Sequence, residues 1–187
     1  MKKFSRCLIA LSFYFVLNSS IFANRWTPEM MIQYQRLSST AISEDGKFIA
    51  YEISTPILES EKSEFHSQIW LLSTYDESRF QLTQGKTSSS QPKFSPDNKW
   101  LGFLSARGEK KTRQLFIISV SGGESIQITD VASSVNRFDW SPDAMKIAFT
   151  MADPETDDYK KRKKEKRDWK IVDEDYKYNH LYVVSIE

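Results

Sequence analysis

Two histidines are the first candidates for chemistry, because histidine is the most frequent general base in enzymes. The sequence holds only His66 and His180, and it has no Gly-x-Ser-x-Gly nucleophile motif. A Ser-His-Asp triad needs a histidine that a carboxylate orients beside a serine. His180 instead opens an apolar segment whose two counterparts open with Gln68 and Gln114. We therefore predict structural roles for both histidines and no catalytic residue in this chain.

Two glycine-containing segments could in principle bind phosphate. The run Gly85-Lys86-Thr87 imitates the end of a phosphate-binding loop, but the position where that loop needs its first glycine is Phe80. The pair Gly122-Gly123 fits a tight turn between strands, where positive φ is required. No cluster of His, Cys, Asp and Glu has the spacing of metal ligands. The sequence therefore predicts no cofactor and no metal site.

The strongest concentration of charge runs from Lys160 to Arg167, inside a segment, 153–177, with nine basic and nine acidic residues. Mixed charge with few apolar residues favours a solvated helix or loop, so we expect no nucleic-acid or anionic-lipid site there. The whole chain has a formal net charge of +1. Without its first 23 residues it holds 23 basic and 25 acidic residues. This balance predicts no nucleic-acid partner.

Repeated turns indicate the elements that must position these side chains. One turn sequence occurs three times, at 43–47, 95–99 and 141–145. After each copy come two further residues, then a small residue and then an aromatic one. Repeats at this spacing are typical of stacked or circular arrays. The position after each turn aspartate needs a left-handed backbone, which glycine and asparagine tolerate and alanine adopts at a cost of about 1 kcal/mol. The copies open with Ser43, Ser95 and Ser141, and we interpret these serines as residues that close turns and not as nucleophiles. The left-handed positions are Gly46, Asn98 and Ala144.

Fixed intervals define the repeated unit. The interval from Gln68 to Thr83 is 15 residues, and that from Gln114 to Thr129 is also 15. Each threonine lies 12 residues before the next turn serine, and only the interval from the turn aspartate to the third strand varies. Four short strands per unit of this length are typical of a β-propeller blade. The variable loops then lie on the same face as the connections between blades, which usually marks the functional face.

We predict an all-β fold, namely a partial β-propeller of about three four-stranded blades, the third incomplete, after a signal peptide and a short helix. The helix is indicated by Thr27 as an N-cap and Pro28 as the first helical residue. The predicted segments are a signal peptide at 1–23, the helix at 24–37, blade 1 at 38–83, blade 2 at 88–130, and blade 3 at 134–187 with its charged insertion at 153–177.

The N-terminus predicts export. A basic stretch, 1–6, precedes an apolar core from Cys7 to Leu17, which is too short to span a bilayer. We expect cleavage after Ala23, and hence a periplasmic or secreted protein with no stable membrane span. An uncleaved membrane anchor is the alternative. Cys7 is the only cysteine, so the mature chain would have no disulfide.

The best copy of the repeat runs from Phe94 to Phe103, with Gly122-Gly123-Glu124 and Ile128-Thr129 after it. It resembles the repeat of TolB-type propellers. Further segments resemble the start of acylaminoacyl-peptidase-like members of the prolyl oligopeptidase family, from about residue 27 to the end of the chain. These segments are Thr27-Pro28-Glu29, Gln68-Ile69-Trp70-Leu71, Ser105-Ala106-Arg107 and Tyr176 to Val184.

The resemblance implies an N-terminal propeller that limits access to the Ser-Asp-His triad of a C-terminal α/β-hydrolase domain. We expect peptide substrates if the chain is joined to such a domain, and no activity from this chain alone. No catalytic residue of that family has a counterpart here. The last strand of the third unit would fall near position 195, so we also expect exposed blade flanks that associate with a protein partner or a second copy. The alternatives are a stand-alone TolB-like binding module and an inactive gene fragment.

Overall fold

The structure, a computed structural model, describes residues 27–58, 63–166 and 178–186. The chain divides into two compact units, Met1–Gln33 and Tyr34–Glu187. The predicted signal peptide at 1–23 and residues 167–177 of the charged insertion lie outside the described residues. No helix in the described ranges is long and apolar enough to cross a membrane.

The first unit contains helix α2 (Pro28–Gln33). Thr27 caps it as predicted, because its Oγ1 accepts a hydrogen bond of 3.3 Å from the backbone N–H of Met30. The helix is shorter than the predicted range of 24–37. The chain is already extended at Arg36 and Leu37, which pair with strand residues of the second unit. Tertiary pairing therefore overrides the helical periodicity at this point.

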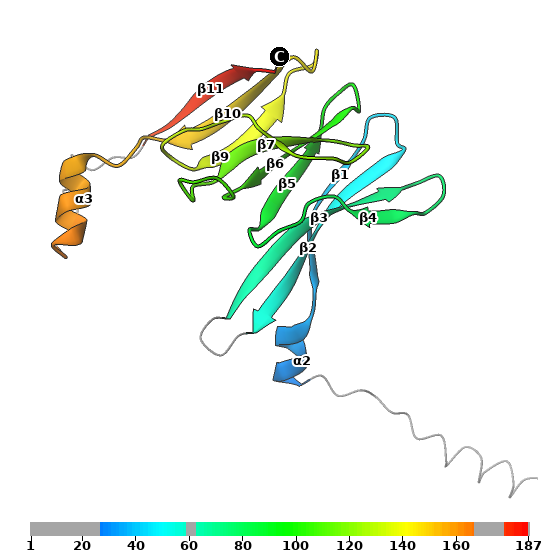
Figure 1. The fold of residues 1–187 in the computed structure, drawn as a ribbon, viewed down its shortest axis with the longest axis horizontal. Coiled ribbons are helices and arrows are strands. Elements are labelled where there is room, and N and C mark those ends of the chain that lie inside the picture. The colour runs from blue at the N-terminus through cyan, green and yellow to red at the C-terminus, as the bar shows by residue number, and fades with distance from the viewer. Residues whose placement is uncertain (1–26, 59–62, 167–177, 187) are drawn as a thin grey trace, which may run out of the picture. The chain divides into compact units, whose positions relative to one another are not determined.

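The second unit consists of three antiparallel sheets that follow one another along the chain (Figure 1). Within the described residues, sheets 1 and 2 have four strands each and sheet 3 has three. This arrangement confirms the predicted all-β partial propeller. Sheet 1 comprises β1 (Arg36–Ile42), β2 (Phe48–Leu58), β3 (Ser63–Ser73) and β4 (Arg79–Gln81); sheet 2 comprises β5 (Ser89–Phe94), β6 (Trp100–Ser105), β7 (Gln114–Ser119) and β8 (Ile126–Gln127); sheet 3 comprises β9 (Val135–Trp140), β10 (Lys146–Ala152) and β11 (Asn179–Ser185).

Sheet 2 is buried on both faces. Side chains alternate along its strands, so Leu101 and Phe103 of β6 join a core shared with sheet 1, and Leu104 joins a core shared with sheet 3. Gly102 also faces sheet 3, where an added Cβ would lie 2.7 Å from Cε2 of Phe138. Gly102 therefore leaves room for the next blade, whereas the aromatic Phe103 packs on the other face, in the core shared with sheet 1.

The three repeated turns share one hydrogen-bond pattern. In the first, Ser43 Oγ donates to Asp45 Oδ1 at 2.7 Å and accepts from the backbone N–H of Phe48 at 2.9 Å. The hydroxyl holds the pKa of the Asp45 carboxyl below its usual value of 3.8, and the other two turn aspartates are shifted in the same direction for the same reason. These serines close turns, as predicted. The left-handed positions have φ values of +68° at Gly46, +58° at Asn98 and +58° at Ala144.

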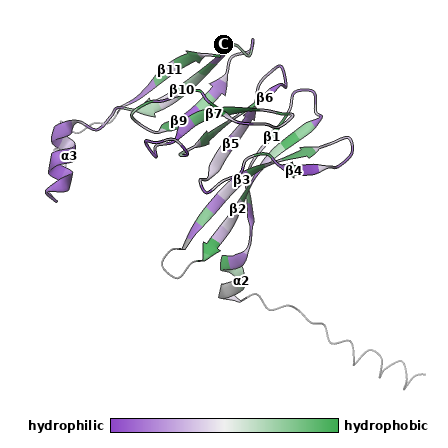
Figure 2. Cartoon of the chain, in the orientation of Figure 1, coloured by the Kyte–Doolittle hydropathy of each residue, from purple (hydrophilic) through white to green (hydrophobic). Residues whose placement is uncertain are grey.

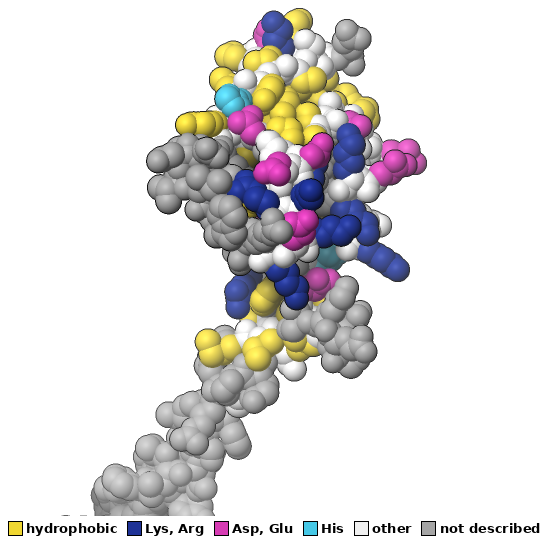
Figure 3. Space-filling model, turned by 90° about the vertical axis from the view of Figure 1, so that its left-hand side faces the viewer, with side chains coloured by type: hydrophobic (Ala, Val, Ile, Leu, Met, Phe, Trp, Pro, Cys, Tyr) yellow, Lys and Arg dark blue, Asp and Glu magenta, His cyan; other side chains and the backbone are white. Residues whose placement is uncertain are grey.

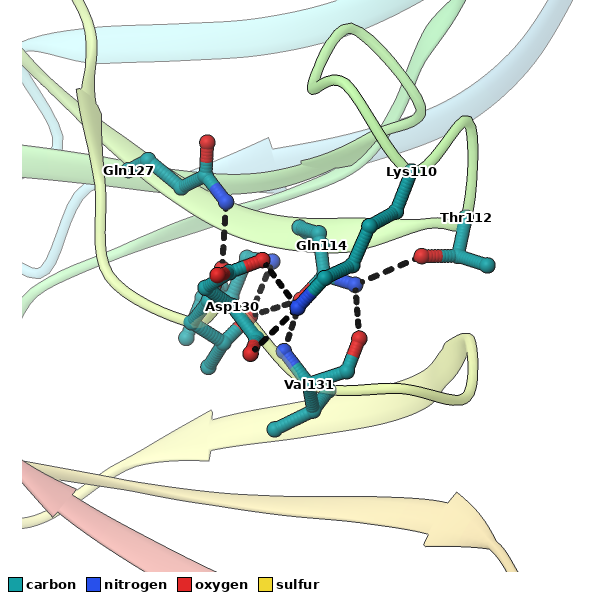
Figure 4. Close-up of polar contacts among 8 residues, drawn as sticks. Lys110, Thr112, Gln114, Gln127, Asp130 and Val131 are labelled. Atoms are coloured by element: carbon teal, nitrogen blue, oxygen red, sulfur yellow. Dashed lines mark hydrogen bonds and ion pairs between the residues drawn. The ribbon is translucent and has the colours of Figure 1, made fainter. Parts of the chain in front are cut away.

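A buried glutamine–threonine pair explains the fixed 15-residue interval. In sheet 2, Thr129 Oγ1 donates to Gln114 Oε1 at 2.9 Å and accepts from the N–H of Leu115 at 2.9 Å. Gln114 also exchanges hydrogen bonds with the backbone of Val131, which follows β8 (Figure 4). The two side chains thus fasten the end of the fourth strand to the start of the third. Sheet 1 repeats the pair with Thr83 Oγ1 donating to Gln68 Oε1 at 2.7 Å and the N–H of Ile69 donating to Thr83 Oγ1 at 2.9 Å.

The connections between the second and third strands differ between the sheets. In sheet 1, β2 and β3 pair over 11 residues each, so their hairpin extends beyond the part of β3 that β4 covers. In sheet 3, the connection contains helix α3 (Asp157–Lys164), which has no buried residue. Figure 2 shows α3 as strongly hydrophilic. The prediction of a solvated helix in the charged insertion is therefore confirmed for its described part.

Strand β11 differs from the expected core strand. Leu181 is 71% exposed and Val183 is 61% exposed, since no described strand covers this face of sheet 3. Figure 3 shows hydrophobic side chains gathered at the end of the molecule where this sheet lies, above an area of mixed acidic and basic side chains. Tyr182 still stacks on Phe149 of β10, with ring centroids 5.5 Å apart.

Candidate functional site

The first strands of the three sheets form the candidate site. Each of β1, β5 and β9 is an edge strand of its own sheet. Together they line one pocket of about 640 Å³. We call these residues the inner wall; they are residues 39–42 and Glu44 of sheet 1, 91–94 of sheet 2, and 137–139 of sheet 3.

Charged side chains of opposite sign meet on the inner wall. Lys93 Nζ lies 2.9 Å from Asp139 Oδ2 and 5.7 Å from the ring centroid of Phe138. The ion pair is largely exposed, so its contribution to stability is below about 1 kcal/mol. Arg137 is exposed and has no acidic partner among the described residues. Its guanidinium is therefore available to a ligand that enters the pocket.

Gln91 links the three sheets beside this pocket. It has a left-handed φ of +55° at an irregularity in the pairing of β5 with β6. Its backbone N–H donates to Oε2 of the buried Glu52 at 3.4 Å, and its Nε2 donates to the carbonyl of Asn136 at 3.5 Å. The inner wall thus offers amide, charged and backbone groups that can form hydrogen bonds and ion pairs with a ligand.

Neither histidine belongs to a triad in the described structure. His66 Nε2 lies 3.2 Å from Gln68 Nε2 of the buried glutamine–threonine pair. His180 Nε2 lies 3.1 Å from Asp153 Oδ1, at the base of the charged insertion. His180 Nε2 also lies 3.2 Å from Asp153 Oδ2, and none of these contacts involves a serine hydroxyl. Among the described residues no group of three or more His, Cys, Asp and Glu could hold a metal ion.

The glycine-containing segments lie away from the inner wall. The carbonyl of Gly85 accepts a hydrogen bond from Gln68 Nε2 at 3.2 Å, as part of the connection from sheet 1 to sheet 2. Gly122 and Gly123 form the turn between β7 and β8 with φ values of +90° and +113°. Three basic residues of α3, Lys160, Arg162 and Lys163, pair with acids nearby, for example Arg162 Nε with Asp158 Oδ2 at 3.3 Å.

Sequence reasoning missed the inner-wall residues and Arg107. The sequence pattern of the short strands does not indicate which strand lies innermost in a blade, so Lys93 and Arg137 look like ordinary exposed charged residues. Arg107 follows the buried strand β6, and its guanidinium contacts three serine hydroxyls, those of Ser89, Ser105 and Ser125. The only sequence signal for it was its place in the Ser-Ala-Arg segment that resembles the peptidase family.

Comparison with known proteins shows similarity to peptidases. A family model described as the N-terminal domain of acylamino-acid-releasing enzyme matches residues 47–112. The uncharacterized peptidase YuxL of Bacillus subtilis (strain 168) is 35% identical over 124 residues, which are 66% of this chain and 18% of that protein. These matches support an N-terminal propeller of the prolyl oligopeptidase family. Dipeptidyl-peptidase 5 of Porphyromonas endodontalis is 26% identical over 125 residues, which are 66% of this chain and 17% of that protein.

Solved structures agree on the fold. The Pyrococcus horikoshii acylaminoacyl peptidase superposes with a TM-score of 0.66 at 18% identity, over 86% of this chain and 25% of that one. The homologues are peptidases, and this chain corresponds to their N-terminal propeller part. The chain spans less than a fifth of the length of the two curated relatives.

Proposed function

We propose that this chain is the access-controlling propeller part of an exported serine peptidase that acts on peptides. The observation that carries the proposal is the inner wall, where the first strands of three consecutive sheets line one pocket with polar and charged side chains. In a propeller the first strands of the blades surround the central channel. Peptides that reach a catalytic domain through this channel would pass Lys93, Arg137 and Asp139.

The position of the insertions supports the proposal. The middle of β3 lies beside the connection from sheet 1 to sheet 2, because Gln68 Nε2 donates to the carbonyls of Gly85 and Thr87. The start of β7 likewise lies beside the connection from sheet 2 to sheet 3, since the N–H of Val135 donates to the carbonyl of Arg113 at 2.8 Å. The elongated hairpin β2–β3 and the α3 insertion therefore emerge on the face of the blade connections. Variable elements on one face suit a face that selects substrates.

Access control is tested in the native polypeptide that contains these residues. A Thr40→Trp variant adds bulk to an exposed position of the inner wall, and Arg79→Trp places the same side chain on exposed β4 at the opposite edge of sheet 1. We expect Thr40→Trp to lower kcat/KM for a peptide of about ten residues roughly tenfold, which corresponds to a barrier of about 1.4 kcal/mol. Its kcat/KM for a short chromogenic substrate should stay near that of Arg79→Trp. Equal losses for both substrates would contradict access control by this wall.

Export is tested by the N-terminal sequence of the protein isolated from the producing cells. We expect the mature chain to begin at Asn24 and to be recovered from the periplasmic or secreted fraction. Recovery of a chain that retains Met1 in the membrane fraction would instead support the uncleaved anchor.

A further inference from the structure

A second pocket, outside the inner wall, lies between sheets 1 and 2. Its volume is about 680 Å³, and residues 80–84 after β3 and 121–125 before β8 form its sides. Arg107 contributes to its lining. The Arg107 side chain runs back over β6 and β7, with its guanidinium carbon 5.1 Å from the ring centroid of Phe103 and 5.4 Å from that of Phe116. The guanidinium is thus stacked on the core between the two sheets.

Three serine hydroxyls fix this guanidinium. Nε donates to Ser105 Oγ at 3.2 Å, Nη1 to Ser125 Oγ at 3.0 Å, and Nη2 to Ser89 Oγ at 2.8 Å. A guanidinium has five N–H groups. One N–H on Nη1 and one on Nη2 therefore have no partner among the described residues. A carboxylate in a bidentate pair accepts two N–H hydrogen bonds, and these two N–H groups could supply them.

The charge of Arg107 is also uncompensated. Within the described ranges, the acids that form ion pairs do so with other basic residues. Partial burial lowers the pKa of the Arg107 guanidinium below its ordinary value. A partly buried cation that has only neutral partners gains more from an added anion than an exposed one does.

The turn between β7 and β8 adds hydrogen-bond donors. The backbone N–H groups of Gly123 and Glu124 make no hydrogen bond in the part of the chain that the structure describes. Gly123 has a φ of +113°, and a Cβ added there would meet nothing within 4 Å, so the glycine serves the backbone conformation and not close packing. Successive N–H groups in such turns form anion-binding concavities. The Glu124 carboxylate in the same wall disfavours a dianion.

We propose that this pocket binds a carboxylate, with Arg107 as the charged anchor and the turn at 121–125 as the second wall. The ligand chemistry is a single planar monoanion, from either a small organic acid or the C-terminus of a peptide. A phosphate dianion fits less well, because Glu124 would repel its second charge. The site does not depend on the inner wall or on the proposed peptidase function.

The test is an NMR titration of the whole 187-residue chain, with the Arg107 Nε–Hε and Gly123 N–H signals as reporters. Sodium acetate is compared with sodium chloride at equal ionic strength, and Gly-Gly with Gly-Gly amide. We expect saturable shifts of both signals with acetate and with Gly-Gly, and none with chloride or the amide. Gly-Gly binding at least tenfold tighter than acetate would assign the carboxylate to a peptide C-terminus, and equal affinities would assign it to small acids.

Variants keep the test independent of folding. Arg107→Gln should abolish the Gly123 shift, whereas Arg113→Gln, which lies outside the pocket wall, should keep it. Glu124→Gln removes the like charge from an exposed position and should tighten acetate binding about two- to fivefold. Shifts that do not saturate, or an unchanged affinity in Glu124→Gln, would overturn the proposal even if Arg107→Gln fails to fold.

Discussion

Replacing Thr129 by valine tests the glutamine–threonine pair that fastens each blade. Valine keeps the shape of threonine but has no hydroxyl, so the N–H of Leu115 loses its acceptor at 2.9 Å. Leu115 is fully buried, and water cannot replace the lost partner. A buried unsatisfied N–H costs about 1–3 kcal/mol. Gln114 Oε1 keeps its hydrogen bond from Val131, so the loss should stay within that range.

The assay is denaturant unfolding followed by circular dichroism, with a thermal melt beside it. For a chain of this size, each kcal/mol lowers Tm by about 2–4 °C, so a loss of about 2 kcal/mol lowers Tm by about 4–8 °C. Thr150→Val is the matched control, because Thr150 lies in β10 and makes no side-chain hydrogen bond among the described residues. Thr83→Val should cost a similar amount through the N–H of Ile69. A free energy of unfolding for Thr129→Val within about 0.5 kcal/mol of the Thr150→Val control would refute the reasoning.

Three further predictions concern packing, the turns and acid. Gly102→Ala should destabilise the chain by about 1–3 kcal/mol in denaturant unfolding, because its Cβ would lie 2.7 Å from the Phe138 ring; an unchanged midpoint would contradict the close approach of sheets 2 and 3. Ala144→Gly should raise Tm slightly, by relief of about 1 kcal/mol of left-handed strain, and a lower Tm would show that Ala144 is not strained. Folded-state aspartate pKa values are lowered, that of Asp76 to about 2 from 3.8, so their stabilisation is present above pH 3.8 and is lost as the pH falls toward 2. Ser95→Ala removes the main cause of the shift at Asp97, and acid unfolding of the two proteins, followed by circular dichroism, should show a smaller loss of stability over this range in the variant.

The blade architecture was predictable because its signals are local. Each turn serine forms a hydrogen bond with the aspartate two residues after it, and Gln114 forms one with Thr129, 15 residues after it. Both contacts therefore leave a fixed residue spacing that can be recognised in the sequence. The helix boundary was less accessible, because Leu37 follows the helical periodicity but pairs with Ile53 across 16 positions. Pairing between distant segments overrides local propensity.

The candidate site was harder to predict than the fold. Lys93 and Arg137 lie in different sheets, and only the packing of edge strands brings them to one pocket. Arg107 bonds Ser105, two positions before it, and two serines that lie 18 positions before and after it in the sequence. No periodicity in the sequence indicates that these residues lie close together in the fold. The expectation of a catalytically silent chain followed from motifs that the sequence lacks, and it stays a prediction.

The most direct test of the proposed function is an activity-based label. Antibodies raised against residues 34–187 would capture the native polypeptide from the producing cells, and a fluorophosphonate probe would then report a reactive serine in it. The account predicts that the captured polypeptide is labelled and hydrolyses an acyl-aminoacyl or dipeptidyl chromogenic substrate, whereas the 187-residue chain made alone does neither. A captured polypeptide that neither takes the label nor hydrolyses these substrates would contradict the assignment to an active serine peptidase.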